Sequence, residues 1–234
     1  MFFVLGFKKS YICILKTKTI TLLKTKIKAA QISNLTDARY FAAWYSEWLG
    51  FCCDTASPNY VSPALLHAIR DWIEGPQIVG EFGAQDAVQI REAVEALNLD
   101  AVQVGFFYDA ARLKTLNGLT VIREIVIDPN EGIDLAPTLE ALSPFVECFL
   151  LEFNKNNISW NDIKNDKNYF NINVLKSLCE KYRILFSMNI KGNEVDELLE
   201  TLQPEGLNLF GGDEEKVGFK SYDEMDELFE AVAE

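Results

Sequence analysis

The stretch KIKAAQISNLTDARYFAAW, residues 26–44, has the pattern of one βα unit. Apolar residues 22–30 predict a strand, and a polar turn follows it. Ser33 or Asn34 can cap the next helix, because both side chains accept hydrogen bonds from the free N–H groups at a helix start. In enzymes built from such units, catalytic side chains lie at the carboxyl ends of the strands. This strand ends at Ala30, which has no reactive group, so the sequence raises the question of whether the chain is an enzyme.

The same pattern repeats along the chain. Short apolar runs, typical of strands covered on both faces, occur at residues 22–30, 48–53, 77–81, 101–104, 120–127, 148–153, 183–188 and 206–210. Helical periodicity and capping residues predict helices at residues 34–45, 62–72, 86–97, 110–116, 135–142, 171–182, 194–202 and 221–232. Strict alternation predicts an α/β fold with a parallel sheet, and eight repeats without a linker favour a single-domain (β/α)8 TIM barrel.

The two ends of this pattern set the expected domain. Residues 1–20 begin with apolar residues and continue with lysines, the reverse of a secretory signal peptide. No apolar run reaches the length of a membrane span. We predict a disordered N-terminal extension over residues 1–20 and a barrel domain over residues 21–234. An added edge strand or a membrane-surface segment are the alternatives for the extension.

Charge is distributed unevenly along the chain. The formal net charge is −13, from 22 Lys and Arg against 35 Asp and Glu. Seven of the lysines lie in the first 30 residues, which contain no acidic residue. The rest of the chain is therefore strongly acidic and should repel nucleic acid and anionic membranes. We expect neither nucleic acid nor a membrane as a partner.

Cysteine and histidine usage argues against metal sites and disulfide frameworks. The five Cys have no regular spacing, and an odd number without a framework indicates reduced thiols in a cytoplasmic protein. The single histidine, His67, nearly excludes a His-rich metal site and makes a Ser-His-Asp site improbable. It falls on a predicted outer helix, where a structural or solvent-facing role fits best. We expect no metal and no cofactor.

Five motifs then occur in order along the chain. They are SNLTDA at 33–38, LGF at 49–51 with SPNYVSP at 57–63, LDAVQ at 99–103, FLLE at 149–152 and GGDEEKVGFK at 211–220. Together they resemble the phosphoribosylanthranilate isomerase family of tryptophan biosynthesis, each on the strand or loop where that family has its counterpart. The resemblance runs from Ile27 to the C-terminus.

The resemblance implies an Amadori rearrangement of N-(5-phosphoribosyl)anthranilate to its 1-deoxyribulose phosphate isomer. An acid protonates the ribose ring oxygen so that the ring opens, and a base then removes the C2 proton. In the family the base is a Cys at the end of the first strand and the acid is an Asp at the end of the sixth. An Arg in the second loop holds the anthranilate carboxylate, and the loops after strands 7 and 8 hold the phosphate.

The chain departs from this pattern at the positions of chemistry. The Cys position is Ala30 and the Gly after it is Gln31, so no proton acceptor is expected there. The Asp position is Glu152, one methylene longer. The Arg position is Asn59, which cannot form a bidentate ion pair with a carboxylate. A substitute base at Cys52 or Cys53 is an alternative to two ordinary buried cysteines.

The substrate-binding positions are partly kept. Gln103 matches the family and either binds substrate or packs inside the barrel mouth. The Gly-Gly pair of the seventh loop has become Met188-Asn189, so side chains occupy the place where backbone N–H groups would approach a phosphate. The eighth loop keeps Gly211 and Gly212, which could hold a phosphate or only form a turn.

One long polar connection, residues 154–169, follows the sixth strand. We expect it to be a mobile lid or a solvated insertion, with Lys155 and Lys164 as alternative ligand contacts. Three functions fit the sequence. One is an isomerase homologue with Glu152 as acid and impaired or altered activity. Another is a non-catalytic barrel that binds a small phosphorylated ligand or a protein partner. A different sugar-phosphate enzyme is a third. The sequence predicts no oligomeric state.

Overall fold

The computed structural model describes residues 22–128, 134–165, 171–211, 214–216 and 219–234, with backbone alone over 214–216 and 219–220. The predicted extension at residues 1–20 and the predicted phosphate residue Gly212 lie outside this range.

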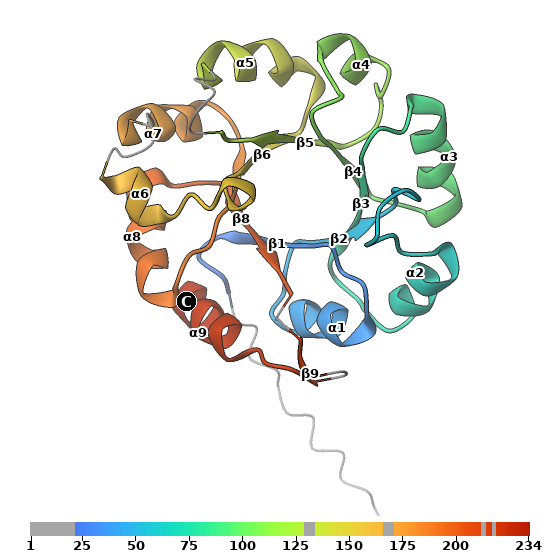
Figure 1. The fold of residues 1–234 in the computed structure, drawn as a ribbon, viewed down its shortest axis with the longest axis horizontal. Helices are drawn as coiled ribbons and strands as arrows, with labels where there is room; N and C mark the ends of the chain where they lie inside the picture. The colour runs from blue at the N-terminus through green and yellow to red at the C-terminus, as the bar shows by residue number, and fades with distance from the viewer. Residues whose placement is uncertain (1–21, 129–133, 166–170, 212–213, 217–218) are drawn as a thin grey trace, which may run out of the picture.

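Eight parallel strands close into a barrel in sequence order, with the last strand paired to the first (Figure 1). The strands are β1 (Lys26–Ala30), β2 (Trp48–Cys52), β3 (Gln77–Phe82), β4 (Ala101–Val104), β5 (Val121–Val126), β6 (Cys148–Glu152), β7 (Ile184–Ser187) and β8 (Gly206–Phe210). The prediction of a (β/α)8 barrel is confirmed.

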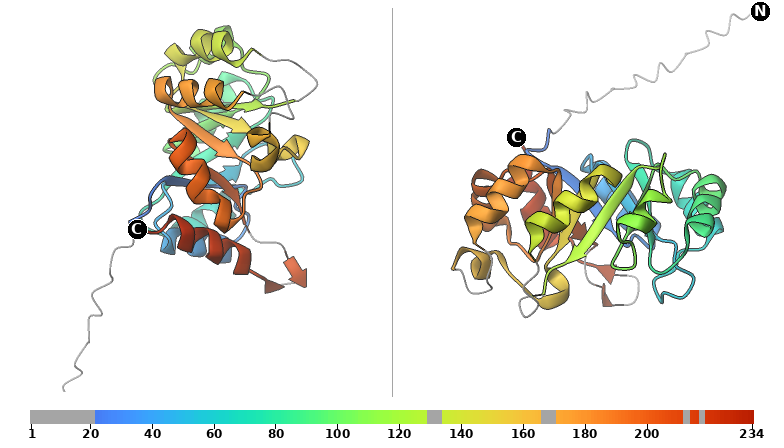
Figure 2. Two further views of the ribbon diagram at one scale, coloured as in Figure 1. Left: turned by 90° about the vertical axis from the view of Figure 1, so that its left-hand side faces the viewer. Right: turned by 90° about the horizontal axis from the view of Figure 1, so that it is seen from above.

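Nine α-helices in the described part of the chain surround the barrel. They are α1 (Leu35–Ala43), α2 (Pro63–Arg70), α3 (Ala87–Leu97), α4 (Ala110–Lys114), α5 (Leu135–Leu142), α6 (Trp160–Lys164), α7 (Ile172–Lys181), α8 (Gly192–Leu202) and α9 (Asp223–Val232). The first and last helices lie side by side (Figure 2), and the ring of Trp44 stacks on that of Phe229. This contact joins the two ends of the ring of helices.

Most predicted strands and helices are present, and only their first or last residues differ from the prediction. The first strand begins at Lys26 rather than at residue 22, because Leu23 instead forms an isolated antiparallel bridge with Ala233. Asn34, and not Ser33, caps α1: its Oδ1 accepts a hydrogen bond from the Asp37 N–H at 2.9 Å. Two short antiparallel strands after β8, β9 (Glu214–Lys216) and β10 (Phe219–Lys220), were not predicted.

The connection after β6 is not a solvated loop over its described part. It contains a short 3-10 helix (Asn154–Asn156) and α6, and the side chains of Ile158, Trp160 and Ile163 are buried. Lys164 does not face a ligand, because its Nζ donates to Glu197 Oε2 at 2.6 Å. Hydrophobic anchors therefore hold this segment against the barrel.

The interior of the barrel has two kinds of layer. Near the amino-terminal ends of the strands it is apolar, with Trp48, Val79, Ala101, Ile122, Cys148, Leu150 and Leu185 in one cluster. Toward the carboxyl-terminal ends it is polar, with Lys28, Glu81, Gln103, Glu152, Ser187 and Asn208 all buried. Buried charged and polar groups are stable only when they are paired and hydrogen-bonded. The polar layer at the carboxyl-terminal ends of the strands must therefore form a connected network.

Lys28 is the centre of this network. Its side chain is fully buried, and its Nζ donates to Glu81 Oε1 at 2.6 Å and to Asn208 Oδ1 at 3.0 Å. Gly50 on the strand between Lys28 and Glu81 leaves room for the pair. A Cβ at position 50 would overlap Glu81 Oε1 and lie 2.8 Å from Lys28 Nζ. A glycine at this position is therefore a condition for the ion pair.

The substitution G50A tests that condition. We expect it to lower the free energy of unfolding by about 1–3 kcal/mol, the usual cost of overpacking a filled interior, as measured by urea denaturation. The matched control is G105A at the end of β4, where an added Cβ meets no atom within 4 Å. G105A should leave the stability unchanged or raise it slightly. Equal stability of the two variants would show that the ion pair does not need the glycine.

Candidate functional site

The carboxyl ends of the eight strands form the mouth of the barrel, the face on which barrel enzymes carry their sites. Ala30 lies there with 4% of its surface exposed. Its neighbour Ala29 packs in the outer core between strands and helices, so the alternation of a strand turns Ala30 inward. The position expected to carry a base thus faces the mouth with only a methyl group.

Gln31 occupies the position that is glycine in the resembled family. Its φ is +52°, in the left-handed region that favours glycine. Its backbone N–H donates to Glu81 Oε2 at 3.2 Å, and its side-chain Oε1 accepts from Asn59 Nδ2 at 2.8 Å. Asn59, the predicted substrate-binding position, is thus exposed and tied to the loop after β1.

Glu152 ends β6 and is 3% exposed. One carboxyl oxygen accepts the Lys155 N–H at 3.2 Å, and the Ser187 side chain hydrogen-bonds the carboxyl. Burial raises the pKa of Glu152 above its ordinary value, while the Ser187 hydrogen bond opposes that rise. A carboxyl group with a raised pKa at the barrel mouth is suited to donate a proton.

A chain of hydrogen bonds crosses the barrel from Glu81 to Glu152. From Glu81 it passes through Lys28 Nζ to Asn208, whose Nδ2 donates to Ser187 Oγ at 3.0 Å, and Ser187 contacts Glu152. Four of these residues were missed at the level of sequence: Lys28, Glu81, Ser187 and Asn208. The sequence did contain a signal for two of them. Lys28 and Glu81 are charged residues inside the strands KIKAA and QIVGEF, which are largely buried.

Gln103 faces the same interior. Its Nε2 donates to Glu124 Oε2 at 2.8 Å, whereas its Oε1 is buried and has no hydrogen-bond partner within the described residues. Lys155, the other expected ligand contact of the β6 connection, is ion-paired with Glu124. Gln103 thus combines packing in the mouth with one free acceptor that a ligand could use.

The two cysteines at the end of β2 face opposite ways. Cys53 packs in the outer core, its Sγ donates to the Phe51 carbonyl at 3.4 Å, and burial raises its pKa to about 12. A thiol with that pKa is protonated near neutral pH and cannot act as the base. Cys52 alternates with it and is turned inward at the mouth, where it is 8% exposed.

The region expected to hold a phosphate is altered. A cavity of about 260 Å³ lies between β7, β8 and α9, and its lining includes Met188, Asn189, Phe210 and Glu224. Gly211 is needed for packing, because an added Cβ would lie 2.8 Å from Asp37 Oδ2. An acidic side chain in the lining opposes the binding of an anion.

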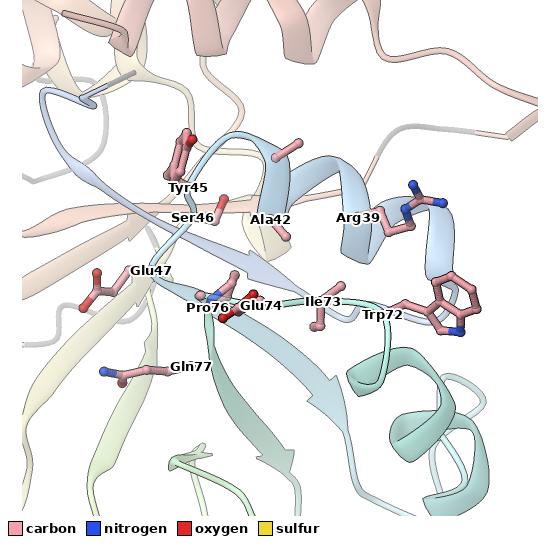
Figure 3. A pocket seen from close by; sticks show the side chains of 12 residues that line it. Arg39, Ala42, Tyr45, Ser46, Glu47, Trp72, Ile73, Glu74, Pro76 and Gln77 are labelled. Carbon is pink, nitrogen blue, oxygen red and sulfur yellow. The ribbon is translucent and has the colours of Figure 1, made fainter. Parts of the chain in front are cut away.

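A second cavity lies at the opposite end of the barrel. It has a volume of about 640 Å³ and is lined by α1, the loop before β2, the loop before β3 and the first residue of β3, with Ser46, Trp72 and Gln77 among its residues (Figure 3). In a (β/α)8 barrel this amino-terminal end serves stability rather than catalysis. The cavity is therefore separate from the mouth that holds Glu152.

The described residues contain no group of three or more His, Cys, Asp or Glu side chains that could hold a metal ion. None of their helices is both long enough and apolar enough to cross a membrane. His67, the single histidine of the chain, is exposed on α2.

Comparisons with known proteins agree with the geometry. No family profile matches the chain. N-(5'-phosphoribosyl)anthranilate isomerase from Chlorobium luteolum is 27% identical over 217 residues, which cover 89% of this chain and 97% of that protein. The solved phosphoribosylanthranilate isomerase of Thermotoga maritima superimposes with a TM-score of 0.70 at 20% identity, covering 89% of this chain and 98% of that one.

A further solved isomerase of the same name holds reduced 1-(o-carboxyphenylamino)-1-deoxyribulose 5-phosphate. It has a TM-score of 0.68 and 18% identity, with the same coverage. At these identities the solved structures establish only that the fold is shared. The sequence similarity to the Chlorobium luteolum protein covers 97% of that protein. Over nearly its whole length the chain is thus similar to curated proteins of the phosphoribosylanthranilate isomerase family, at an identity low enough to be consistent with a divergent member.

Proposed function

We propose that this chain is an isomerase of the phosphoribosylanthranilate type that keeps its acid but lacks its thiol base, so that its turnover is strongly reduced. The observation that carries the proposal is the contrast between two inward-facing positions at the mouth. Glu152 is a buried carboxyl group with a raised pKa, and Ala30 is a methyl group.

Glu152 would perform the first step. In its neutral form it donates a proton to the ribose ring oxygen, and the C1–O bond breaks as the ring opens to a protonated Schiff base. Because burial favours the neutral carboxyl, this donor is available at a higher pH than an exposed glutamate would be. The longer side chain shifts the carboxyl relative to aspartate, and a misplacement of about 1 Å can cost about 10²-fold in rate.

The second step lacks its expected group. A positioned base contributes about 10²–10⁴-fold, and neither the methyl group of Ala30 nor the protonated thiol of Cys53 supplies one. Substrate affinity should also be lower than in the relatives. Asn59 is bonded to Gln31 in place of an arginine that would bind a carboxylate, and Glu224 lines the phosphate region. Gln103 and Gly211 are the positions we assign to substrate contact.

The alternative is a barrel without catalysis that binds a phosphorylated small molecule or a protein partner. The Gln31–Asn59 hydrogen bond favours it, because that bond occupies both side chains at the place where a substrate carboxylate would be held. The free thiols of Cys52, Cys53, Cys148 and Cys179 support a reducing compartment, and we propose that the protein is cytoplasmic.

Restoring the thiol tests the first proposal. A30C should raise kcat for N-(5'-phosphoribosyl)anthranilate by about 10²-fold, since a positioned base contributes about 10²–10⁴-fold. The matched control is A30S, which has nearly the same size but an alcohol in place of an acidic thiol, and it should not gain activity. Product formation is followed in purified enzyme, and growth without tryptophan of a strain lacking the isomerase gives a second readout. If A30C binds substrate but stays inactive, the non-catalytic alternative is favoured.

The acid is tested in the same background. E152Q added to A30C should lower kcat by about 10²–10⁴-fold, because a neutral amide cannot protonate the ring oxygen. In A30C itself, kcat should fall as the pH rises through the raised pKa of Glu152, since the carboxyl loses the proton that it must donate. Equal activity of A30C and A30C/E152Q would exclude Glu152 as the acid.

Glu152 also predicts a pH dependence of stability. Because its pKa is raised in the folded state, the folded protein binds more protons than the unfolded chain at pH values above about 4.3, the ordinary pKa of glutamate. This contribution to stability is therefore lost as the pH rises from that value through the raised pKa. E152Q should remove the loss, as seen in urea denaturation at a series of pH values. Parallel curves for the parent and E152Q would contradict the prediction.

A further inference from the structure

The proposed function leaves open which group removes the C2 proton in this chain, and the geometry of β3 supplies an answer that rests on that function. Glu81 points into the mouth, and its Oε2 accepts the backbone N–H of Gln31 at 3.2 Å. That N–H belongs to the peptide that joins Gln31 to Ala30. A carboxylate from β3 therefore reaches across β2 to the residue that has lost its thiol.

We propose that Glu81 is the proton acceptor of this barrel and carries its residual isomerase activity. In the ring-opened Schiff base, the C2–H bond breaks and the proton moves to a carboxylate oxygen of Glu81. The electron pair of that bond forms the C1=C2 double bond, and the electrons of the C=N bond move to nitrogen and neutralise its charge. The resulting enol gives the ketone when its O–H proton returns to the ionised Glu152 and C1 takes a proton back from Glu81, so that both carboxyl groups regain their starting states.

Glu81 has the capacity for this step. A carboxylate offers about four acceptor positions, and the described structure uses two of them, for Lys28 Nζ and for the Gln31 N–H. The Lys28 ammonium is fully buried, whereas the Glu81 side chain keeps 10% of its surface exposed at the mouth. The group that faces a substrate is therefore the carboxylate and not the lysine beneath it.

The charges of the site balance over the two proton transfers. Glu152 loses a proton when the ring opens, and Glu81 gains one when C2 is deprotonated. One carboxyl is neutral and one is ionised both before and after. The hydrogen bonds through Lys28, Asn208 and Ser187 connect the two groups. Because a change of net charge in a buried region is costly, a paired exchange of this kind suits a closed interior.

The other candidate bases are less suited. Cys53 faces the outer core with its pKa raised to about 12. Glu124 lies on β5, and its carboxylate contacts Gln103 and Lys155 rather than the loop after β1. Cys52 is turned inward, but no bond from its thiol to the loop after β1 exists among the described residues, whereas Glu81 has one. Cys52 is therefore the competitor that the experiment must separate from Glu81.

The test follows the rate at which deuterium leaves C2 of C2-deuterated N-(5'-phosphoribosyl)anthranilate in water, whether it is released to solvent or carried to C1, together with product formation. The proteins compared are the parent, E81Q, C52S, A30C and A30C/E81Q. The matched control is E205Q. Glu205 is also ion-paired with an inward lysine of β1, with Lys26 Nζ at 2.7 Å, but it lies at the amino-terminal end of the barrel.

The expected result has three parts. E81Q loses at least about 10²-fold in the rate of C2 exchange, E205Q and C52S keep the parent rate, and A30C/E81Q regains exchange. The rate of exchange should depend on pH differently in the parent and in A30C/E81Q, because a different group accepts the proton in each. In A30C/E81Q it should still rise toward about 8.5, the ordinary pKa of a thiol. A residue with only a structural role would not change the group that titrates.

Several results overturn the proposal. These are parent-like exchange in E81Q, loss of exchange in C52S but not in E81Q, and a parent that exchanges no faster than buffer. If E81Q does not fold, E81D takes its place, because it keeps the charge and shortens the reach by one methylene. Slowed exchange in E81D then supports the proposal, and an unchanged rate overturns it. Failure of A30C to turn over substrate counts against the proposed function and is read separately.

Discussion

The upper half of the barrel depends on the ion pair between Lys28 and Glu81. Burying an ammonium group without partners would cost several kcal/mol, so the residues around it are arranged to satisfy it. The Glu81 carboxylate neutralises the Lys28 ammonium, and Asn208 accepts a second hydrogen bond from it. Gly50, on the strand between them, has no side chain that would overlap the pair. The same carboxylate then fixes the loop after β1 through the Gln31 N–H. One pair thereby determines both the packing of the interior and the shape of the mouth.

The fold could be predicted because its signals are local. Strands at residues 101–104 and 206–210 and the helix at 135–142 have the predicted bounds. The other bounds shift at their ends, where pairing with a distant segment decides, as for Leu23 and Ala233. For the connection after β6, the alternative of a solvated insertion is wrong over the described residues, because its apolar residues, which are few and separated by Asn and Lys, are buried. Their burial follows from what they pack against, which a local pattern does not contain.

The site could be predicted only in part. Ala30 and Glu152 were found because each keeps its place in a motif on a single strand. The network between them was missed because Lys28 and Glu81 are 53 residues apart, and only the closed barrel and its register place them in contact. Matching the chain to the family position by position identifies the residue that replaces the thiol. It cannot identify a side chain from another strand that reaches the same point in space.

That distinction changes how the loss at position 30 is understood. A thiol on β1 and a carboxylate on β3 approach the mouth from different strands, but both can reach a substrate carbon held between the strand ends. The glutamate cannot act freely, because it also neutralises Lys28. Any proton that it accepts weakens the ion pair that stabilises the interior, unless Glu152 gives up a proton in the same cycle. In the proposed mechanism, activity and stability are therefore coupled through a single carboxylate.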